Sequence, residues 1–357
     1  MSVSPPKRNN GFPVPAERVL VSQTGSEATS IPKITVFDYS QSEFNQWSTT
    51  SVDVCVPPPK GVTVRWINVD GIRNHEVVEH ICQCFGLHPL TIEDITTPDQ
   101  QPKVEILPEY ALIIIKMIHH TGPDSRMVSE QVSIVFGKDY VLSFQEIQGD
   151  VFDPIRRSIT EGSGRVRRGK ADYLAYGLVD MIVDFYFSIL TEIGEKIEDA
   201  QEQLIANPST EILRDVYDIK RKVIELRRST WPVREIVLAL ERDGVQMFEK
   251  TTLPYLRDLY DHVIQITDHI EIYREWLASM LDIYLSSITN RLNEVIKFLT
   301  VLSTIALPPT VIGSWYGMNF VNQMPELNWP FFYPALMAVM FSMMIVLFII
   351  FKRRHWI

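Results

Sequence analysis

Two long stretches without a charged side chain constrain this chain more than any other feature of its sequence. Residues 298–325 form the first stretch, and residues 331–351, a run of 21, form the second. About 20 apolar residues in a helix cross the roughly 30 Å hydrocarbon core of a bilayer. Aromatic residues gather between the stretches, as at a membrane interface: Trp315, Tyr316, Trp329, Phe331, Phe332 and Tyr333. The sequence therefore predicts two membrane spans in preference to a buried helix pair.

Charges at the ends of these stretches predict the orientation of the spans. Arg291 and Lys297 precede the first span, residues 352–354 are basic, and the connecting loop contains only Glu326. By the positive-inside rule, both termini lie in the cytoplasm and the protein spans the cytoplasmic (inner) membrane. The first 30 residues contain no apolar signal segment, so the N-terminal region is expected to be cytosolic. Two spans enclose little space, so transport would require several subunits around an axis.

Composition excludes several classes of function. With 34 basic and 44 acidic residues the net charge is −10, which argues against a nucleic-acid partner. Cys55, Cys82 and Cys84 are the only cysteines; an odd number argues against a disulfide framework and for a reducing compartment. Without partnering ligands, Cys82 and Cys84 on an amphipathic helix favour packing over metal binding. We find no glycine-rich phosphate loop and no catalytic Ser or Cys constellation, so an enzyme is not expected.

A long helix is predicted to lead into the first span. Residues 255–307, 53 in number, contain neither proline nor glycine, and as one helix they would extend about 80 Å. Alternating steps of three and four along this helix select one mostly polar stripe: Asp282, Ser286, Thr289, Asn293, Ile296, Thr300, Ser303, Leu307, Thr310 and Ser314. Hydroxyl and amide side chains are costly against lipid, so the stripe should face other helices or water.

Two interpretations of this stripe stay open. Small and hydroxyl residues commonly let membrane helices pack closely. Alternatively the stripe lines a pore, because Asp282 at its cytosolic end would concentrate cations at the mouth of a ring of subunits. Ile296 and Leu307 would then form apolar constrictions, or else be ordinary core residues. Pro308 and Pro309 leave backbone carbonyls near the middle of the span without their usual donors.

Two short motifs after the first span carry a resemblance to a known family: Trp315-Tyr316-Gly317-Met318-Asn319-Phe320 and Met324-Pro325-Glu326-Leu327. They resemble the signature of the CorA family of divalent-cation channels, in which Tyr-Gly-Met-Asn ends the first of two C-terminal spans. The resemblance implies an α+β membrane protein with an N-terminal cytosolic α/β domain, a long helical stalk and two C-terminal transmembrane helices. It also implies a funnel-shaped homopentamer embedded in lipid, and no other protein partner is evident.

The resemblance also implies which residues handle the ion. Gly317, Met318 and Asn319 would form the selectivity filter, with Asn319 facing the ion. Neutral amide and backbone oxygens can accept hydrogen bonds from the tightly held waters of Mg²⁺ without removing them. Without the resemblance, Asn319 would be interpreted as a turn residue. The matching pore-lining positions are Asp282, Asn293, Ile296, Leu299 or Thr300, Leu307 and Thr310.

A regulatory divalent site between subunits is a further implication of the resemblance. The matching residues are Asp94 and Asp258, with Glu93 and Asp261 as weaker candidates. Carboxylates from adjacent subunits repel one another when no ion is bound, so loss of Mg²⁺ would favour opening and binding would favour closure. From the residues alone, ordinary surface pairing of Asp258 with Arg257 or Arg274 is the alternative.

The region before the spans divides into three segments. Residues 1–30 are rich in Pro, Ser, Asn and Gly and are expected to be disordered, and residues 31–168 are expected to form the α/β domain. In this domain strands are predicted at 34–37, 62–68, 110–117, 131–136 and 140–144, and helices at 75–85 and 151–159. Residues 137–139 would join the last two strands as a hairpin. Residues 169–250 form a helical pair, predicted at 171–206 and 210–241 with Pro232 as a kink or break.

The remaining segments follow from the spans. They are a stalk and first span at 251–314, an outer loop at 315–330, a second span at 331–351 and a basic tail at 352–357. The helical pair carries a mostly acidic face, which is usually a solvated surface and which the resemblance implies attracts cations: Asp180, Asp184, Glu192, Glu195, Glu198, Asp199 and Glu202.

The residue patterns predict a channel in the membrane, and the resemblance implies that it is a homopentamer that passes Mg²⁺ into the cell and closes when cytosolic Mg²⁺ occupies the site between subunits. Oxygen ligands favour hard Mg²⁺, but a pore that accepts hydrated ions discriminates weakly, so Co²⁺, Ni²⁺ or Zn²⁺ is an alternative cargo. A membrane-anchored cytosolic sensor of divalent ions is an alternative from a different class. A pure anchor would need neither the polar stripe nor Asn319.

Overall fold

The computed structural model describes residues 20–21, 32–50, 53–121, 126–318, 329–354 and 356. The chain separates into two compact units. Unit 1 comprises Met1–Glu202 and Arg214–Ala278, and unit 2 comprises Gln203–Leu213 and Ser279–Ile357. Within residues 1–30, predicted to be disordered, only Leu20–Val21 are described, and they form a short strand, β1.

A mixed β-sheet forms the centre of unit 1. Its order is β1-β6-β7-β8-β4-β2-β3, and β5 pairs with β6. The pairs β4–β8 and β1–β6 are parallel, and the other pairs among the described strands are antiparallel. The remaining strands are β2 (Lys33–Tyr39), β3 (Phe44–Thr49), β4 (Val64–Asp70), β5 (Lys103–Ile106), β6 (Ala111–Thr121), β7 (Arg126–Phe136) and β8 (Tyr140–Gln145).

The five predicted strands are confirmed as β2, β4, β6, β7 and β8, and β7 and β8 form the predicted hairpin. The sequence analysis missed β3, β5 and the helix α2 (Pro89–Thr96). β3 leaves most of its side chains at least partly exposed and so lacks an apolar alternation, and β5 has only four residues. The predicted helices at 75–85 and 151–159 are confirmed as α1 (His75–Cys84) and α3 (Asp153–Thr160).

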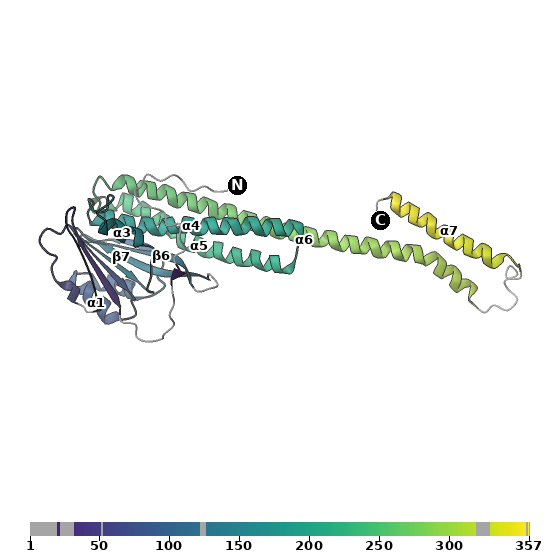
Figure 1. The fold of residues 1–357 in the computed structure, drawn as a ribbon, viewed down its shortest axis with the longest axis horizontal. Helices are drawn as coiled ribbons and strands as arrows, with labels where there is room; N and C mark the ends of the chain where they lie inside the picture. The colour runs from purple at the N-terminus through teal and green to yellow at the C-terminus, as the bar shows by residue number, and fades with distance from the viewer. Residues whose placement is uncertain are drawn as a thin grey trace. The chain divides into compact units, whose positions relative to one another are not determined.

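Helices cover both faces of this sheet, as Figure 1 shows for α1 and α4. On one face, Ile67 and Val69 of β4 join a core cluster with Val78 and Ile81 of α1. On the other face, Trp66 stacks on Phe37 with 4.8 Å between ring centroids. β2, β4 and β8 are therefore buried on both sides, which explains their nearly continuous apolar runs.

Three long helices complete the described architecture of unit 1: α4 (Ala171–Ala206), α5 (Thr210–Arg242) and the N-terminal part of α6 (Leu253–Tyr316). An added Cβ at Gly194 of α4 would lie 2.3 Å from the hydroxyl of Tyr273 on α6, so glycine permits their close approach. Asp172 of α4 accepts hydrogen bonds from the Thr252 hydroxyl at 2.7 Å and the Glu249 amide at 2.9 Å. Pro232 lies inside α5 without breaking it.

The acidic face predicted for the helical pair is solvated only in part. Asp180 is fully buried and Asp184 is 6% exposed, so the expectation of a solvated run is wrong for these two residues. Both lie in the first half of α4, which packs within unit 1, whereas Glu195, Glu198, Asp199 and Glu202 lie further along α4. More than two helix turns separate Asp184 from the next acidic residue, Glu192, and a list of charges does not reveal that the surroundings change between them.

The expectation of no disulfide is also wrong for one pair of cysteines. Cys55 and Cys84 form a disulfide with 5.8 Å between their Cα atoms, and Cys82 is a buried free thiol. Cys55 ends the short 3-10 helix η1 (Asp53–Cys55), and Cys84 ends α1. Their positions lie 29 apart in the sequence, so only the folded chain, which brings η1 against α1, shows that they are close.

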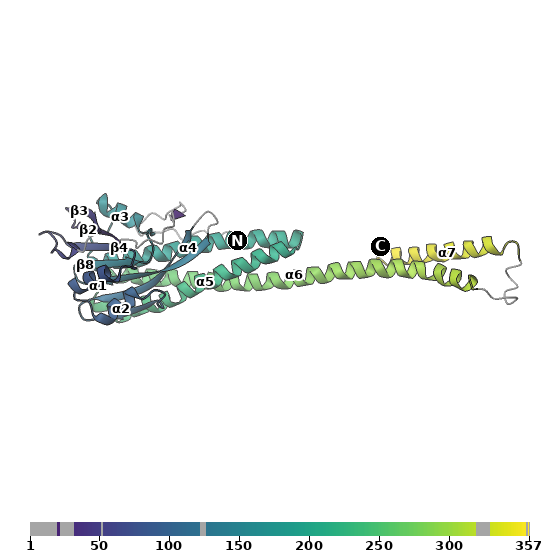
Figure 2. The same cartoon turned by 90° about the horizontal axis from the view of Figure 1, so that it is seen from below.

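Unit 2 contains the C-terminal part of α6 and the helix α7 (Phe332–Arg353), which runs back in the opposite direction (Figures 1 and 2). The predicted uninterrupted helix is confirmed, since α6 continues through Pro308 and Pro309 to Tyr316. Of the described residues, three helices are long and apolar enough to cross a membrane, namely α4, α6 and α7. However, 83% of the most apolar window of α4 is buried, against 6% for α6 and 0% for α7.

Candidate functional site

The mostly polar stripe of α6 is fully open in the single chain. Within unit 2, all its predicted pore-lining members are exposed: Asp282, Asn293, Ile296, Leu299, Thr300, Leu307 and Thr310. The structure does not choose between Leu299 and Thr300, because both are exposed. Nothing else in the described part of unit 2 covers this row.

The threonine hydroxyls of this row donate to backbone carbonyl oxygens of their own helix. The Thr300 hydroxyl donates to the Ile296 carbonyl oxygen at 2.7 Å, and the Thr310 hydroxyl donates to the Ala306 carbonyl oxygen at 2.7 Å. Each hydroxyl hydrogen is therefore committed to the backbone, while the oxygen keeps lone pairs that can accept. Such oxygens suit a cation whose bound waters donate hydrogen bonds outward.

A different face of α6 carries the less exposed residues. Val301 is 5% exposed, and Ile305, Pro308, Ile312 and Tyr316 are only partly exposed. These positions follow steps of three and four, so they form a second row on the helix.

A matching row lies on α7. Six of its seven partly exposed residues also follow steps of three and four, Met337 being the exception: Phe332, Leu336, Met340, Met344, Leu347 and Phe351. The rings of Tyr316 and Phe332 meet with 5.2 Å between centroids. The two apolar rows therefore face each other, and the polar stripe points roughly away from α7.

The predicted filter lies where α6 ends. Gly317 and Met318 follow the helix and are exposed, and their amides donate to the carbonyl oxygens of Gly313 at 3.0 Å and Trp315 at 3.4 Å. Asn319 lies outside the described residues, as does the Met324-Pro325-Glu326-Leu327 motif. The described part of the predicted filter is thus two residues at the C-terminal end of α6.

Glu93 and Asp94, two of the predicted regulatory carboxylates, lie on α2. The buried Tyr110 hydroxyl fixes this helix, since it accepts from the His88 amide at 2.9 Å and pairs with the Thr91 hydroxyl at 2.9 Å. Glu93 is exposed, while the Asp94 side chain is only 17% exposed and binds the Lys103 ammonium at 2.6 Å.

Lys103 already balances the charge of Asp94. Its ammonium also binds Glu105 at 2.7 Å. Although burial works against the charge, these two hydrogen bonds raise the pKa of Lys103 above its ordinary value. A cation bound at Asp94 would therefore compete with this ammonium.

Asp258 and Asp261 lie on the N-terminal part of α6. Asp261 is exposed, and the half-exposed Asp258 lies 4.0 Å from the His262 ring. Arg257 binds Glu241 at 2.8 Å and Arg274 binds Glu271.

Within one chain the four predicted carboxylates do not form a single metal-binding cluster. Among the described residues, the only group of at least three His, Cys, Asp or Glu side chains close enough to hold a metal is Cys55, His80 and Cys84. The sequence analysis missed this group. The spacing of His80 and Cys84, four residues apart on one helix, was its only local signal.

Comparisons with known proteins identify the family of this chain. The family model described as "CorA-like Mg2+ transporter protein" matches residues 62–353. The chain belongs to the CorA family. The resemblance that the Gly317-Met318-Asn319 motif indicated is therefore confirmed.

Relatives of this CorA protein match it over most of their length. It is 42% identical to the cobalt/magnesium transport protein CorA of Thermotoga maritima over 91% of this chain and 92% of that one. It is 29% identical to the cobalt/magnesium transport protein CorA of Methanocaldococcus jannaschii over 82% of this chain and 91% of that one. These relatives are named as transport proteins and not as enzymes.

A solved structure shares the fold of this CorA protein. The complete structure of the CorA magnesium transporter from Methanocaldococcus jannaschii matches with a TM-score of 0.78 at 22% identity. The match covers 91% of this chain and 98% of that one. The predicted combination of an N-terminal α/β region, long helices and apolar C-terminal helices is confirmed at this level.

Proposed function

We propose that this chain is the subunit of a channel that carries Mg²⁺, and also Co²⁺, into the cell across the cytoplasmic membrane. The names of its relatives, cobalt/magnesium transport proteins, support both ions. The single observation that carries the proposal is the exposed polar stripe of α6 on the side turned away from α7. An anchor that only tethers the protein would not need such a face.

Five copies of the chain surround the pore in this proposal. Each α6 turns its stripe from Asp282 to Thr310 towards the axis, and each α7 packs outside it. The apolar residues that α7 leaves open, such as Val346 and Ile349, then contact lipid. The basic residues at both ends support a cytoplasmic location of the termini, by the positive-inside rule.

Gly317, Met318 and Asn319 form the filter at the outer mouth. The ion keeps its waters there, because neutral oxygens accept hydrogen bonds from these waters. A ring of carboxylates would bind the ion more tightly and hinder its release. Along the pore, the lone pairs of the Thr300 and Thr310 hydroxyls continue the same chemistry.

Flux into liposomes tests this function. We expect Mg²⁺ to enter liposomes that contain the full-length protein, read with an internal Mg²⁺ dye, and we expect Asn319→Ala to abolish entry. Asn322→Ala, a second asparagine in the same loop, is the matched control and should keep the flux. Normal flux in Asn319→Ala with an intact assembly would overturn the filter. Entry of Zn²⁺ or Co²⁺ alone would change the cargo, and no entry of any divalent would favour the anchored sensor.

Closure by internal Mg²⁺ is proposed to use Asp94 and Asp258 of neighbouring subunits, with Glu93 and Asp261 nearby. Mg²⁺ bridges the carboxylates, and its loss leaves them to repel one another. Lys103 binds Asp94 at 2.6 Å, so an ion bound at Asp94 competes with this ammonium.

We expect Asp258→Ala to shift closure to higher internal Mg²⁺ without reducing maximal flux, measured as flux against Mg²⁺ loaded inside the liposomes. Asp268→Ala, which removes another exposed carboxylate from α6, is the control and should leave the curve unchanged. An unaltered curve in Asp258→Ala would contradict the assignment.

A further inference from the structure

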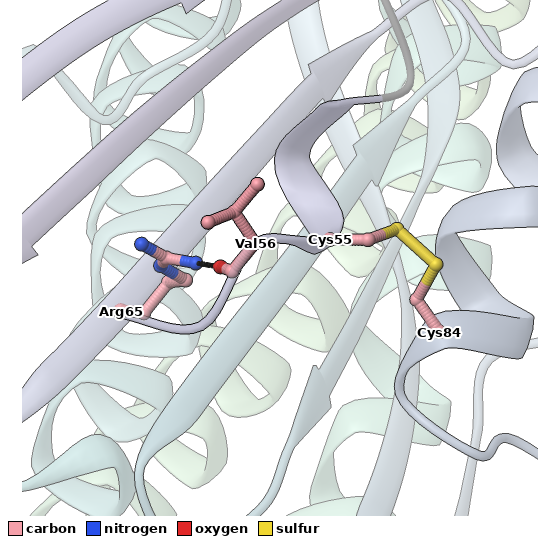
Figure 3. The surroundings of a disulfide bond; sticks show 4 residues. All are labelled: Cys55, Val56, Arg65 and Cys84. Atoms are coloured by element: carbon pink, nitrogen blue, oxygen red, sulfur yellow. Dashed lines mark hydrogen bonds between the residues drawn. A yellow bond between two sulfur atoms is a disulfide. The ribbon is translucent and has the colours of Figure 1, made fainter. Parts of the chain in front are cut away.

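Three side chains that can bind a soft metal ion meet at the surface of unit 1, far in sequence from the predicted pore and filter. Their ligand atoms, the sulfurs of Cys55 and Cys84 and a ring nitrogen of His80, all lie within 4.8 Å of one another. His80 and Cys84 are exposed, and Cys55 is partly exposed. Figure 3 shows the two cysteines, one from η1 and one from the end of α1.

The helix side of this group is anchored by the core. Val78, Ile81 and Cys82 of α1 are buried in the cluster under the sheet, which leaves the exposed face of the last turns to His80 and Cys84. Side chains four residues apart lie on the same face of a helix. The pair is therefore presented together by α1, with no help from the disulfide.

The η1 side is anchored independently. Val54, next to Cys55, is fully buried, and the Arg65 guanidinium donates to the Val56 carbonyl oxygen (Figure 3). Arg65 is itself held by two hydrogen bonds to Asp38, at 2.6 and 2.7 Å. Contacts on both sides of Cys55 thus keep its sulfur near α1 whether or not the disulfide is present.

The geometry suits a tetrahedral ion. Zn²⁺ binds thiolate sulfur at about 2.3 Å and imidazole nitrogen at about 2.0–2.1 Å, so its ligand atoms lie roughly 3.5–4 Å apart. The disulfide holds the two sulfurs closer than this, and the 5.8 Å between the Cα atoms leaves room for rotation about the Cα–Cβ bonds to separate them. Water can take the fourth position, because the site is open to solvent.

We propose that Cys55, His80 and Cys84 in their reduced form bind one borderline-soft divalent ion, Zn²⁺ or Co²⁺. Binding replaces the two thiol protons by two metal–sulfur bonds and releases both protons to solvent. The disulfide form has no thiolate to offer and does not bind. Thiolate and imidazole ligands discriminate against Mg²⁺, which prefers oxygen, so this site responds to ions that the proposed pore accepts but does not select. The inference needs no transport activity.

Cobalt absorption tests the site in the full-length protein in detergent, reduced with a phosphine and kept in excess Mg²⁺. We expect one Co²⁺ per chain to give the near-ultraviolet charge-transfer band of cobalt–thiolate bonds, and one Zn²⁺ to abolish it. Oxygen-bound Co²⁺ in the pore gives no such band, so this readout is independent of the proposed function. The disulfide form of the same protein should show no band.

Variants assign the ligands. Cys55→Ser and Cys84→Ser should each lose the band, and His80→Ala should weaken Co²⁺ binding by at least on the order of tenfold, the effect of losing even an outer partner of a ligand. Cys82→Ala and His75→Ala, on the same helix, are the matched controls and should keep both band and affinity. His80 is exposed, so its variant tests the site without disturbing the core. No band in the reduced protein, or a band that survives Cys84→Ser, would overturn the proposal.

Discussion

The two helices α4 and α7 have similar sequence character and opposite surroundings. Both are long and apolar enough to cross a membrane, yet 83% of the apolar window of α4 is buried within the folded chain and none of that of α7 is. Leu174 and Ile182 of α4 are fully buried, whereas Val346 and Ile349 of α7 are about half exposed. Length and apolarity identify a helix whose side chains must be shielded from water. They do not tell whether other parts of the protein or lipid shield them.

Buried carboxylates mark the difference in the sequence itself. Asp180 and Asp184 lie within the apolar part of α4, one turn apart, and both are buried. Carboxylates at the centre of a membrane span are costly. α7 has no charged residue before Lys352. Unit 1 can satisfy buried polar groups with partners of its own, whereas α7 has none to satisfy.

The largest expected effect comes from the same substitution placed in each helix. Ile182→Asp puts a charge in the core of unit 1, and we expect a loss of about 5 kcal/mol or more in the free energy of unfolding, enough to prevent folding. Ile345→Asp in α7 should leave the thermal unfolding of unit 1 unchanged and reduce membrane insertion instead. Circular dichroism and membrane fractionation measure the two. A folded Ile182→Asp protein would contradict the conclusion that α4, unlike α7, is buried within the protein.

A smaller effect is expected where unit 1 buries an ion pair. Arg65 binds Asp38 at 2.6 Å, and the two side chains are 6% and 1% exposed. Asp38→Ala leaves the guanidinium without its charged partner, so we expect a loss of about 3–5 kcal/mol in the free energy of unfolding. Glu271→Ala, which removes a half-exposed partner of Arg227, should cost about 0–1 kcal/mol. Equal costs in denaturant titrations would show that burial does not decide the strength of these pairs.

The third effect depends on pH. Burial raises the pKa of Glu130 from 4.5 to about 8, against the lowering effect of the Ile147 amide, and Glu146, Asp150 and Asp70 raise it further. His119 lies 3.3 Å away. The folded state therefore holds a proton that the unfolded state loses above about pH 4.5, so stability falls as pH rises to about 8 and then levels off.

We expect Glu130→Gln to remove this slope, which for one proton is at most about 1.4 kcal/mol per pH unit. Unfolding midpoints measured from pH 5 to pH 9 would show a flatter profile. Burial also raises the pKa of Asp70, to about 6, and should preserve a weaker slope below that pH. Glu161→Gln, at an exposed position, should retain the full slope. A variant profile that matches the parent would assign the pH response to other groups.

The sequence determined the elements that depend on neighbours along the chain. Freedom from glycine and proline indicated α6, continuous apolar runs indicated β6 and β8, and the Gly317-Met318-Asn319 motif indicated the family, because each signal lies within a few consecutive residues or turns. The polar stripe of α6 could also be predicted, since helical periodicity alone fixes which residues share a face.

Only the tertiary structure decided which faces of these helices and strands are buried and which residues contact them. It buried Asp180 in unit 1, paired Asp94 with Lys103, matched the apolar row of α6 to that of α7, and brought Cys55 to His80 and Cys84. Each of these contacts joins residues that local patterns treat as independent. Their proximity is fixed by the packing of the whole chain. The favourable free energy of burial depends on the total apolar area removed from water, which no single segment determines.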